Sequence, residues 1–420
     1  MRETPIVQKK TLLLIVGILL IATNLRAPFT SLAPLLEMIR DSFGLTAAQA
    51  GLLQTLPLLA FAVFSPFAAG IAHRLGMEKS LFYSLLVIVL GICLRSYAGL
   101  SGLYGGTLLI GLGIAIGNVL LPGILKRDLP HKAASLTGLY ALTMGLAAAL
   151  GSATMIPIAH NLGAGWQNSL LATIVFPLIA LVIWLPQLTR TTVNSTDQKG
   201  SQSRRSTGVW SAGLAWQVSL FFGLNSFIYY IIVAWLPAIL QNIGYSVTEA
   251  GSLHGLLQLS TALPGFFIGP VLSKLRDQRI LGVLFALMGA LGLTGLLLIP
   301  SIATVWVTII GFCTGAGVIL GLAFISLRSS NSAQAAALSG MAQSVGYLLA
   351  AGGPPVVGLI HDRIGGWTLP LVGCIALSFI LAVLGYLAGR ARQLPNHNEP
   401  ETESSSTHCA MTTGDKYESR

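Results

Sequence analysis

The stretch "TNLRAPFTSLAPLL", Thr23 to Leu36, follows the run "TLLLIVGILLIA", Thr11 to Ala22, and its one charge is Arg26. Together they are long enough to cross a bilayer core, which takes about 20 apolar residues. At about 1.5 Å per helical residue, Arg26 lies roughly 24 Å from Lys10, near or beyond the middle of that core. An arginine there costs about 2.5–3.5 kcal/mol on insertion scales, so it predicts a functional site within a membrane-spanning helix.

The composition also indicates a membrane protein. The 420-residue chain is 54% hydrophobic and only 9% charged, whereas soluble proteins carry about 25% charged residues. The formal net charge is +10, but the basic residues form short clusters between apolar runs and not one patch. Membrane topology therefore explains them better than nucleic-acid binding does, and no nucleic-acid partner is expected.

Apolar runs of about 18 or more residues recur along the whole chain. They predict an all-α membrane protein with twelve transmembrane helices in contact with the lipid bilayer. The predicted spans lie near residues 11–36, 48–71, 80–98, 102–125, 134–159, 167–186, 213–240, 248–272, 280–300, 303–327, 335–360 and 367–389.

Two polar stretches divide this series of spans. Residues 1–186 are expected to form an N-terminal six-helix half, and residues 213–392 a C-terminal six-helix half. Residues 187–212 read as a cytoplasmic linker between the halves. Residues 393–420 are rich in Ser, Thr and Glu and read as a disordered cytoplasmic tail.

The basic residues predict the orientation. With the N-terminus placed in the cytoplasm, 20 of the 24 lysines and arginines fall on the cytoplasmic side. Only Arg40, Arg95 and Arg363 fall in loops on the other side, and Arg26 lies within the membrane. Since cytoplasmic loops carry an excess of lysine and arginine, both termini are expected in the cytoplasm.

An internal repeat relates the two halves. "QAGLLQTLPLLA" (Gln49 to Ala60) precedes "EAGSLHGLLQLS" (Glu249 to Ser260) by 200 residues. "GLGIAIGNVLL" (Gly111 to Leu121) and "GFCTGAGVILG" (Gly311 to Gly321) have the same offset. Two copies of a six-helix unit are parallel repeats around an axis along the membrane normal. This is a design of secondary transporters that work by alternating access.

The loop "GIAHRLGMEK", Gly70 to Lys79, resembles the loop between spans two and three of the major facilitator superfamily. It has glycines at positions 70 and 76 and basic residues at 74 and 79. His73 departs from the pattern, because an aspartate is usual there. If that aspartate helps to latch the two halves together, the latch in this chain must differ.

A closer resemblance, to the cyanate porter family, covers nearly the whole chain up to about Arg390. The family's first-span motif is matched by Asn24, Arg26, Thr30, Pro34, Leu35 and Leu36. The resemblance implies a bacterial inner-membrane transporter with a small-molecule substrate. It is strongest to the branch that carries 2-nitroimidazole, which implies export of such small polar compounds. Uptake of cyanate or another small anion is the alternative.

Helical spacing places Arg26, Phe29 and Thr30 on one small or polar face, which suits a cavity wall. A fixed guanidinium there could attract an anion or a nitro group, and Phe29 could stack on a flat ring. The alternative is a structural arginine bound to backbone carbonyls. Asn24 falls nearly opposite Arg26 and is expected to hydrogen-bond a neighbouring helix.

His254 and Gln258 lie one turn apart in the eighth span. An imidazole titrates near neutral pH, so His254 could couple proton flow to transport. The alternative is a neutral histidine hydrogen-bonded between helices. Because no aspartate or glutamate lies deep in any predicted span, coupling through a buried carboxylate is not predicted.

Further polar residues are weaker candidates for substrate contact. They are Asn118 in span four, Asn225 and Tyr229 in span seven, and Gln343 in span eleven. Tyr229 could stack on an aromatic substrate, whereas Tyr230 is expected to point elsewhere. Spans 1, 4, 7 and 10 line the cavity in the superfamily, so the resemblance favours Asn118 and Asn225. Helix–helix hydrogen bonding is the alternative for each.

Other classes of protein find little support. The chain has no nucleotide-binding motif, no metal-ligand spacing and no nucleophile–base pair, so no cofactor, no metal and no enzymatic activity are expected. A membrane sensor that binds without transport is a rival from another class. The internal repeat argues against it, whereas a large soluble output domain would have supported it.

Overall fold

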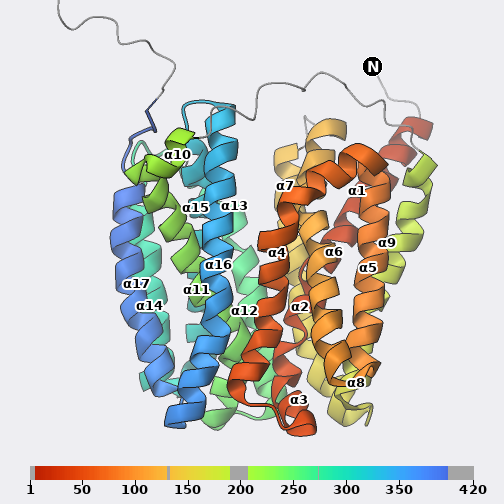
Figure 1. The fold of residues 1–420 in the computed structure, drawn as a ribbon. Coiled ribbons are helices and arrows are strands. Elements are labelled where there is room, and N and C mark those ends of the chain that lie inside the picture. The colour runs from red at the N-terminus through yellow and green to blue at the C-terminus, as the bar shows by residue number, and fades with distance from the viewer. Residues whose placement is uncertain (1–4, 130–132, 190–206, 273, 396–420) are drawn as a thin grey trace, which may run out of the picture.

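The computed structural model describes residues 5–129, 133–189, 207–272 and 274–395, and every regular element in these ranges is helical (Figure 1). Within them, eleven helical stretches are long and apolar enough to cross a membrane. The linker residues 190–206 and the tail residues 396–420 lie outside the described ranges. We call the end of the molecule at which α1 (Pro5–Asn24) begins and α17 (Thr368–Ala388) finishes the terminal end, and the opposite end the far end.

The helices up to residue 189 pack mainly on one another and form the first bundle. Its elements are α1 (Pro5–Asn24), α2 (Ala27–Thr30), η1 (Ala33–Leu35), α3 (Leu36–Phe43), α4 (Ala47–Leu75), α5 (Met77–Tyr97), α6 (Gly99–Asp128), α7 (Ala133–Ile156), η3 (Pro157–Asn161), α8 (Gly165–Ala172), α9 (Val175–Trp184) and η4 (Leu185–Thr189).

The helices from residue 207 onward form the second bundle. Its elements are α10 (Thr207–Ser211), α11 (Gly213–Asn242), α12 (Val247–Ala262), α13 (Pro264–Leu272), α14 (Arg279–Leu298), η5 (Pro300–Ile302), α15 (Ala303–Leu327), α16 (Ser332–Ile364) and α17 (Thr368–Ala388).

The eighth predicted span, 248–272, is divided in the structure. α12 ends at Ala262 and α13 begins at Pro264, so neither piece alone is counted among the eleven long stretches. Proline has no N–H to continue the helical ladder, and its ring clashes with the preceding turn. Because both pieces pack on α15, we take α12 and α13 together as the eighth predicted span, in addition to the eleven long stretches.

The two bundles repeat the same helix start. Thr46 caps α4 by accepting from the Gln49 N–H at 3.2 Å, and Ser246 caps α12 by accepting from the Glu249 N–H at 3.2 Å. In both helices the side chain of the residue three positions later accepts a hydrogen bond from the backbone N–H of the cap residue, which completes a capping box. The caps lie 200 positions apart, the offset of the sequence repeat.

The bundles contact each other through α4 with α16 and through α7 with α12. Glycines allow the backbones to touch, since a Cβ on Gly51 would lie 2.7 Å from the Pro354 carbonyl oxygen. A Cβ on Gly255 would likewise lie 2.8 Å from the Ala149 carbonyl oxygen. Both contacts involve the far-end halves of these helices. Figure 1 shows the two bundles meeting toward the far end and diverging toward the terminal end.

A carboxylate reinforces the far-end contact. Asp362 of α16 accepts hydrogen bonds from the backbone N–H groups of Ala47 and Ala48, each at 2.9 Å. These two N–H groups begin α4, where the helix has no partners of its own for them and where its dipole favours negative charge. The second bundle thus caps a helix of the first.

Candidate functional site

The first span is interrupted at the arginine that the sequence singles out. α1 ends at Asn24 and α2 begins at Ala27, and Arg26 has the irregular backbone angles φ −132° and ψ −46°. Pro28 explains the break, because a proline cannot donate to the carbonyl four residues before it. The prediction of one continuous helix is therefore wrong here. The break places Arg26 at a junction between two helical segments.

Arg26 reaches across to the second bundle. Its Nη1 donates to Thr261 Oγ1 at 2.8 Å, and its Nη2 donates to the Tyr229 hydroxyl at 2.7 Å. Its guanidinium carbon lies 5.4 Å from the centroid of the Tyr229 ring. Among the described residues Arg26 has no carboxylate partner. Neutral hydroxyls satisfy part of its hydrogen bonding but leave its charge uncompensated.

Both hydroxyls are held so that they accept from Arg26. Thr261 donates its own proton to the Gln258 carbonyl oxygen at 2.7 Å, and Tyr229 donates to Gln258 Oε1 at 3.0 Å. Gln258 Nε2 in turn lies 3.3 Å from His254 Nε2. We call these five residues the Arg26 network. It brings together the predicted site residues Arg26, Tyr229, His254 and Gln258.

Aromatic rings lie beside this network. Phe29 packs edge-to-face on Tyr230, with centroids 5.9 Å apart, and Tyr230 packs on Tyr229 at 5.0 Å. The expectation that Tyr230 points away from the site is therefore wrong. Tyr347 of α16 contacts Phe61 of α4 at 5.9 Å and so joins the bundles at a second point.

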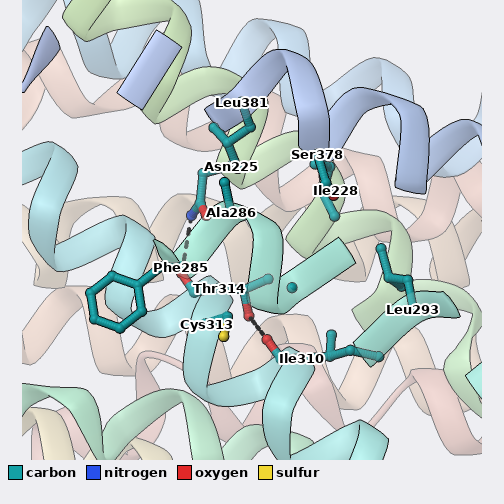
Figure 2. A pocket seen from close by; sticks show the side chains of 11 residues that line it. Asn225, Ile228, Phe285, Ala286, Leu293, Ile310, Cys313, Thr314, Ser378 and Leu381 are labelled. Atoms are coloured by element: carbon teal, nitrogen blue, oxygen red, sulfur yellow. Dashed lines mark hydrogen bonds between the residues drawn. The ribbon is translucent and has the colours of Figure 1, made fainter. Parts of the chain in front are cut away.

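Asn225 does not join the Arg26 network. Its side-chain nitrogen donates to the Thr314 carbonyl oxygen of α15 at 3.0 Å, inside the second bundle. Figure 2 shows Asn225 directed toward Thr314 in a pocket that also contains Phe285 and Cys313. The pocket holds only about 10 Å³, the lower limit for a single water molecule, about 10–15 Å³. In this structure Asn225 bonds two helices of the second bundle, and its contact with substrate stays a prediction.

The other predicted polar residues make local contacts. Thr30 donates to the Arg26 carbonyl oxygen at 3.2 Å, and Gln343 donates to Ser339 of its own helix at 2.8 Å. Asn24 donates to Leu20 of its own helix at 2.9 Å, so its predicted bond to a neighbouring helix is wrong. Asn118 is half-buried on α6, and its side chain has no hydrogen bond within the described ranges. It therefore stays a candidate.

Two polar residues that lie near Arg26 were not identified in the sequence analysis. Thr261 lies three residues after Gln258 on the same helical face, a spacing that could have revealed it. Arg95 was placed in an outer loop, yet it is 1% exposed within α5. Its Nη1 donates to the Pro28 carbonyl oxygen at 2.6 Å, while its Nε and Nη2 have no partner in the described part. Arg95 thus holds the segment that follows Arg26.

The sequence comparison now gives the family. Residues 14–351 match the Major Facilitator Superfamily. The chain belongs to that superfamily. It is therefore a multi-pass membrane protein and a secondary transporter of a small molecule, and not an enzyme.

Individual relatives narrow the position within the Major Facilitator Superfamily. The chain is 54% identical over 392 residues to the 2-nitroimidazole transporter of Escherichia coli K12, an alignment that covers 93% of this chain and 99% of the relative. It is 26% identical over 354 residues to the cyanate transport protein CynX of the same organism, which covers 84% and 91%. The crystal structure of a D-xylose–proton symporter superposes with a TM-score of 0.71 at 13% identity and covers 90% and 97%, which shows the superfamily's fold.

Proposed function

We propose that the chain exports small, planar, polar compounds such as 2-nitroimidazole across the bacterial inner membrane by alternating access. The 54% identity to a 2-nitroimidazole transporter supports this substrate class. The distribution of 20 of 24 lysines and arginines supports an orientation with the terminal end in the cytoplasm. The far end then faces the periplasm.

The observation that carries the proposal is the pair of bonds from Arg26 to the other bundle. A planar guanidinium can hold the two oxygens of a nitro group through two parallel N–H bonds. Thr261 and Tyr229 now occupy two of its donors, at 2.8 and 2.7 Å, and a substrate would take their place. The rings of Phe29, Tyr229 and Tyr230 offer edges and faces for a flat heterocycle.

The contacts between the bundles fit alternating access. α4 with α16 and α7 with α12 close the far end, whereas Arg26 bridges the bundles from the interrupted first span. Substrate bound at Arg26 would lie between two rigid bodies that rock about it. The structure then represents the state that is closed toward the periplasm.

Uptake of cyanate or another small anion is the alternative, which the 26% identity to CynX supports. Cyanate is linear and cannot use a stacking surface, so the aromatic rings beside Arg26 favour a flat substrate. Purified protein in liposomes would be loaded with labelled 2-nitroimidazole or with labelled cyanate. We expect vesicles that contain the protein to release 2-nitroimidazole faster than protein-free vesicles do. Transport of cyanate alone would replace this proposal with the alternative.

Proton coupling through His254 is a further part of the proposal. His254 is fully buried and joins Arg26 through Gln258 and Tyr229, so a proton on its ring would be felt at the substrate site. His254→Gln should keep substrate binding but lose the acceleration of transport by an imposed pH gradient. His160→Gln, at an exposed histidine near the far end, is the control. An unchanged response to the gradient in His254→Gln would exclude this histidine from coupling.

Arg95 is expected to act by positioning Arg26. Arg95→Gln should weaken 2-nitroimidazole binding about tenfold, because the loss of one charge-assisted bond, about 1.5–3 kcal/mol, frees the Pro28 carbonyl and the segment beside Arg26. Arg95→Lys can still donate to that carbonyl and should recover most of the affinity. Binding would be measured by isothermal calorimetry in detergent. Wild-type affinity in Arg95→Gln would contradict the positioning role.

A further inference from the structure

A groove on the second bundle runs along α14 beside α17. It has a volume of about 720 Å³ and is lined by apolar side chains of α14 from Ile280 to Leu291. Asp277, Arg279 and Tyr386 form its polar end. These residues lie at the terminal end of the molecule, where α14 begins and α17 finishes. The groove is separate from the Arg26 network, which lies between the bundles.

Close packing of two helices creates this groove. Gly282 of α14 and Gly385 of α17 meet backbone to backbone, since a Cβ on Gly282 would lie 2.9 Å from the Gly385 carbonyl carbon. Side chains next to this contact stand out from it, and Ile280 is 79% exposed. From Asp277 to Leu291 the groove extends roughly 21 Å at about 1.5 Å per residue. That length exceeds half of a bilayer core of about 30 Å.

We propose that an anionic phospholipid of the cytoplasmic leaflet binds here, with its phosphate at Arg279 and Tyr386 and an acyl chain along α14. The proposal rests on the orientation given above and not on the transported substrate. A phospholipid combines the two chemistries that the groove presents, a phosphate for its polar end and a hydrocarbon chain for its apolar length.

The polar end is arranged for a phosphate. Arg279 donates from Nη1 to the Tyr386 hydroxyl at 3.3 Å, and its guanidinium carbon lies 5.2 Å from that ring's centroid. Asp277 forms an ion pair with the same guanidinium, with Oδ2 3.0 Å from Arg279 Nε. These contacts fix the guanidinium plane and leave Nη2 for a ligand. The Tyr386 hydroxyl accepts from Arg279, so its own proton can be donated to a phosphate oxygen.

The surrounding charge favours an anion. The Gln278 N–H donates to the Gly389 carbonyl oxygen at 3.1 Å, which joins the loop before α14 to the end of α17. This juncture carries one acidic residue, Asp277, and five basic ones, Lys274, Arg276, Arg279, Arg390 and Arg392. Clusters of this kind next to the cytoplasmic surface attract anionic lipids. Asp277 is already committed to the α14 backbone, where it accepts from the Arg279 N–H at 2.9 Å.

The basic residues at the terminal end of the first bundle differ from those beside the groove. Arg127 at the end of α6 is neutralised by Asp128 at 2.6 Å and Glu78 at 2.5 Å. The hydrogen bond to Asp128, followed by that to Glu78, raises the pKa of Arg127 above its ordinary value. Lys79, which is exposed, lies 200 positions before Arg279 and so occupies the corresponding place in the repeat. It provides a matched control residue.

Native mass spectrometry of the full chain in detergent, with phosphatidylglycerol or phosphatidylcholine added, tests this site. Wild-type protein should retain phosphatidylglycerol preferentially. Arg279→Gln should lose about fivefold in phosphatidylglycerol retention, the effect of about one charge at an anionic surface. Leu287→Trp should fill the groove and displace the lipid with every charge intact. Lys79→Gln should retain lipid as the wild type does.

Several outcomes would overturn the proposal. Equal retention of both lipids by the wild type, or wild-type retention by Arg279→Gln, would exclude a headgroup site at Arg279. A wild-type dimer that masks α14 and is indifferent to phosphatidylglycerol would assign the groove to a second copy of the chain. Thermal melting without added lipid checks that Leu287→Trp is folded. If it is not, Leu284→Phe replaces it as the variant that fills the groove.

Discussion

Replacing Arg26 by lysine should leave a folded, inserted protein that binds 2-nitroimidazole about 100-fold more weakly than the wild type. Lysine keeps the positive charge but cannot form two parallel bonds to a nitro group. Lysine can still make one of the two bonds, and loss of the other, about 1.5–3 kcal/mol or roughly 10- to 150-fold, accounts for this magnitude. Calorimetric binding in detergent measures it.

Arg26→Ala should weaken binding at least as much, and it removes a half-buried charge that has no carboxylate partner within the described ranges. Its melting temperature should therefore equal or exceed that of the wild type. Arg40→Gln is the control, since Arg40 pairs with Glu37 at 2.8 Å near the far end. A purely structural Arg26 gives the opposite pattern: both variants express poorly, and the folded fraction binds normally.

Gly358→Val should reduce transport about 100-fold or more while substrate still binds. A Cβ on Gly358 would lie 2.5 Å from the Ala47 carbonyl oxygen and 2.8 Å from the Ala48 nitrogen. Valine would force α16 away from α4 and prevent the Asp362 carboxylate from reaching the start of α4. An overpacking penalty of about 3 kcal/mol lowers the population of the state closed at the far end about 100-fold.

Gly352→Val is the matched control for this variant. It makes the same substitution on the same helix, but a Cβ on Gly352 would meet no atom within 4 Å. Transport in liposomes and binding in detergent would be measured for both variants. Rapid transport by Gly358→Val, or an equal loss in Gly352→Val, would show that close approach of α4 and α16 is not required.

Much of the fold could be predicted from local sequence features. Apolar runs predict the spans, and the capping residues Thr46 and Ser246 repeat at the 200-residue offset of the sequence. The two breaks were also readable, since Pro28 and Pro264 stand where α2 and α13 begin. They were missed because hydropathy reports the length of an apolar run and not the continuity of its hydrogen bonds.

The site was harder to predict because polar side chains of this protein are buried in two places, inside a bundle and between the two bundles. Asn225 and Tyr229 lie one turn apart on α11, so helical spacing assigns them to one face. In the structure Asn225 bonds to Thr314 within its own bundle, whereas Tyr229 bonds to Arg26 of the other bundle. Periodicity separates lipid-facing from buried positions. It cannot distinguish the interior of a bundle from the surface between two bundles. Arg95 was missed for a different reason: it was assigned to an outer loop, whereas it is buried within its own bundle and donates to the Pro28 carbonyl.

The bonds from Arg26 to Thr261 and Tyr229 have a consequence for the empty carrier. A guanidinium stripped of substrate in a membrane interior would normally oppose reorientation, and such a carrier would run only as an exchanger. If substrate binds at Arg26 as proposed, these two hydroxyls take its place when it leaves, and two guanidinium donors stay hydrogen-bonded in the unloaded protein. The unloaded protein can then return without counter-substrate. On the proposed function, we therefore expect net flux and not obligatory one-for-one exchange.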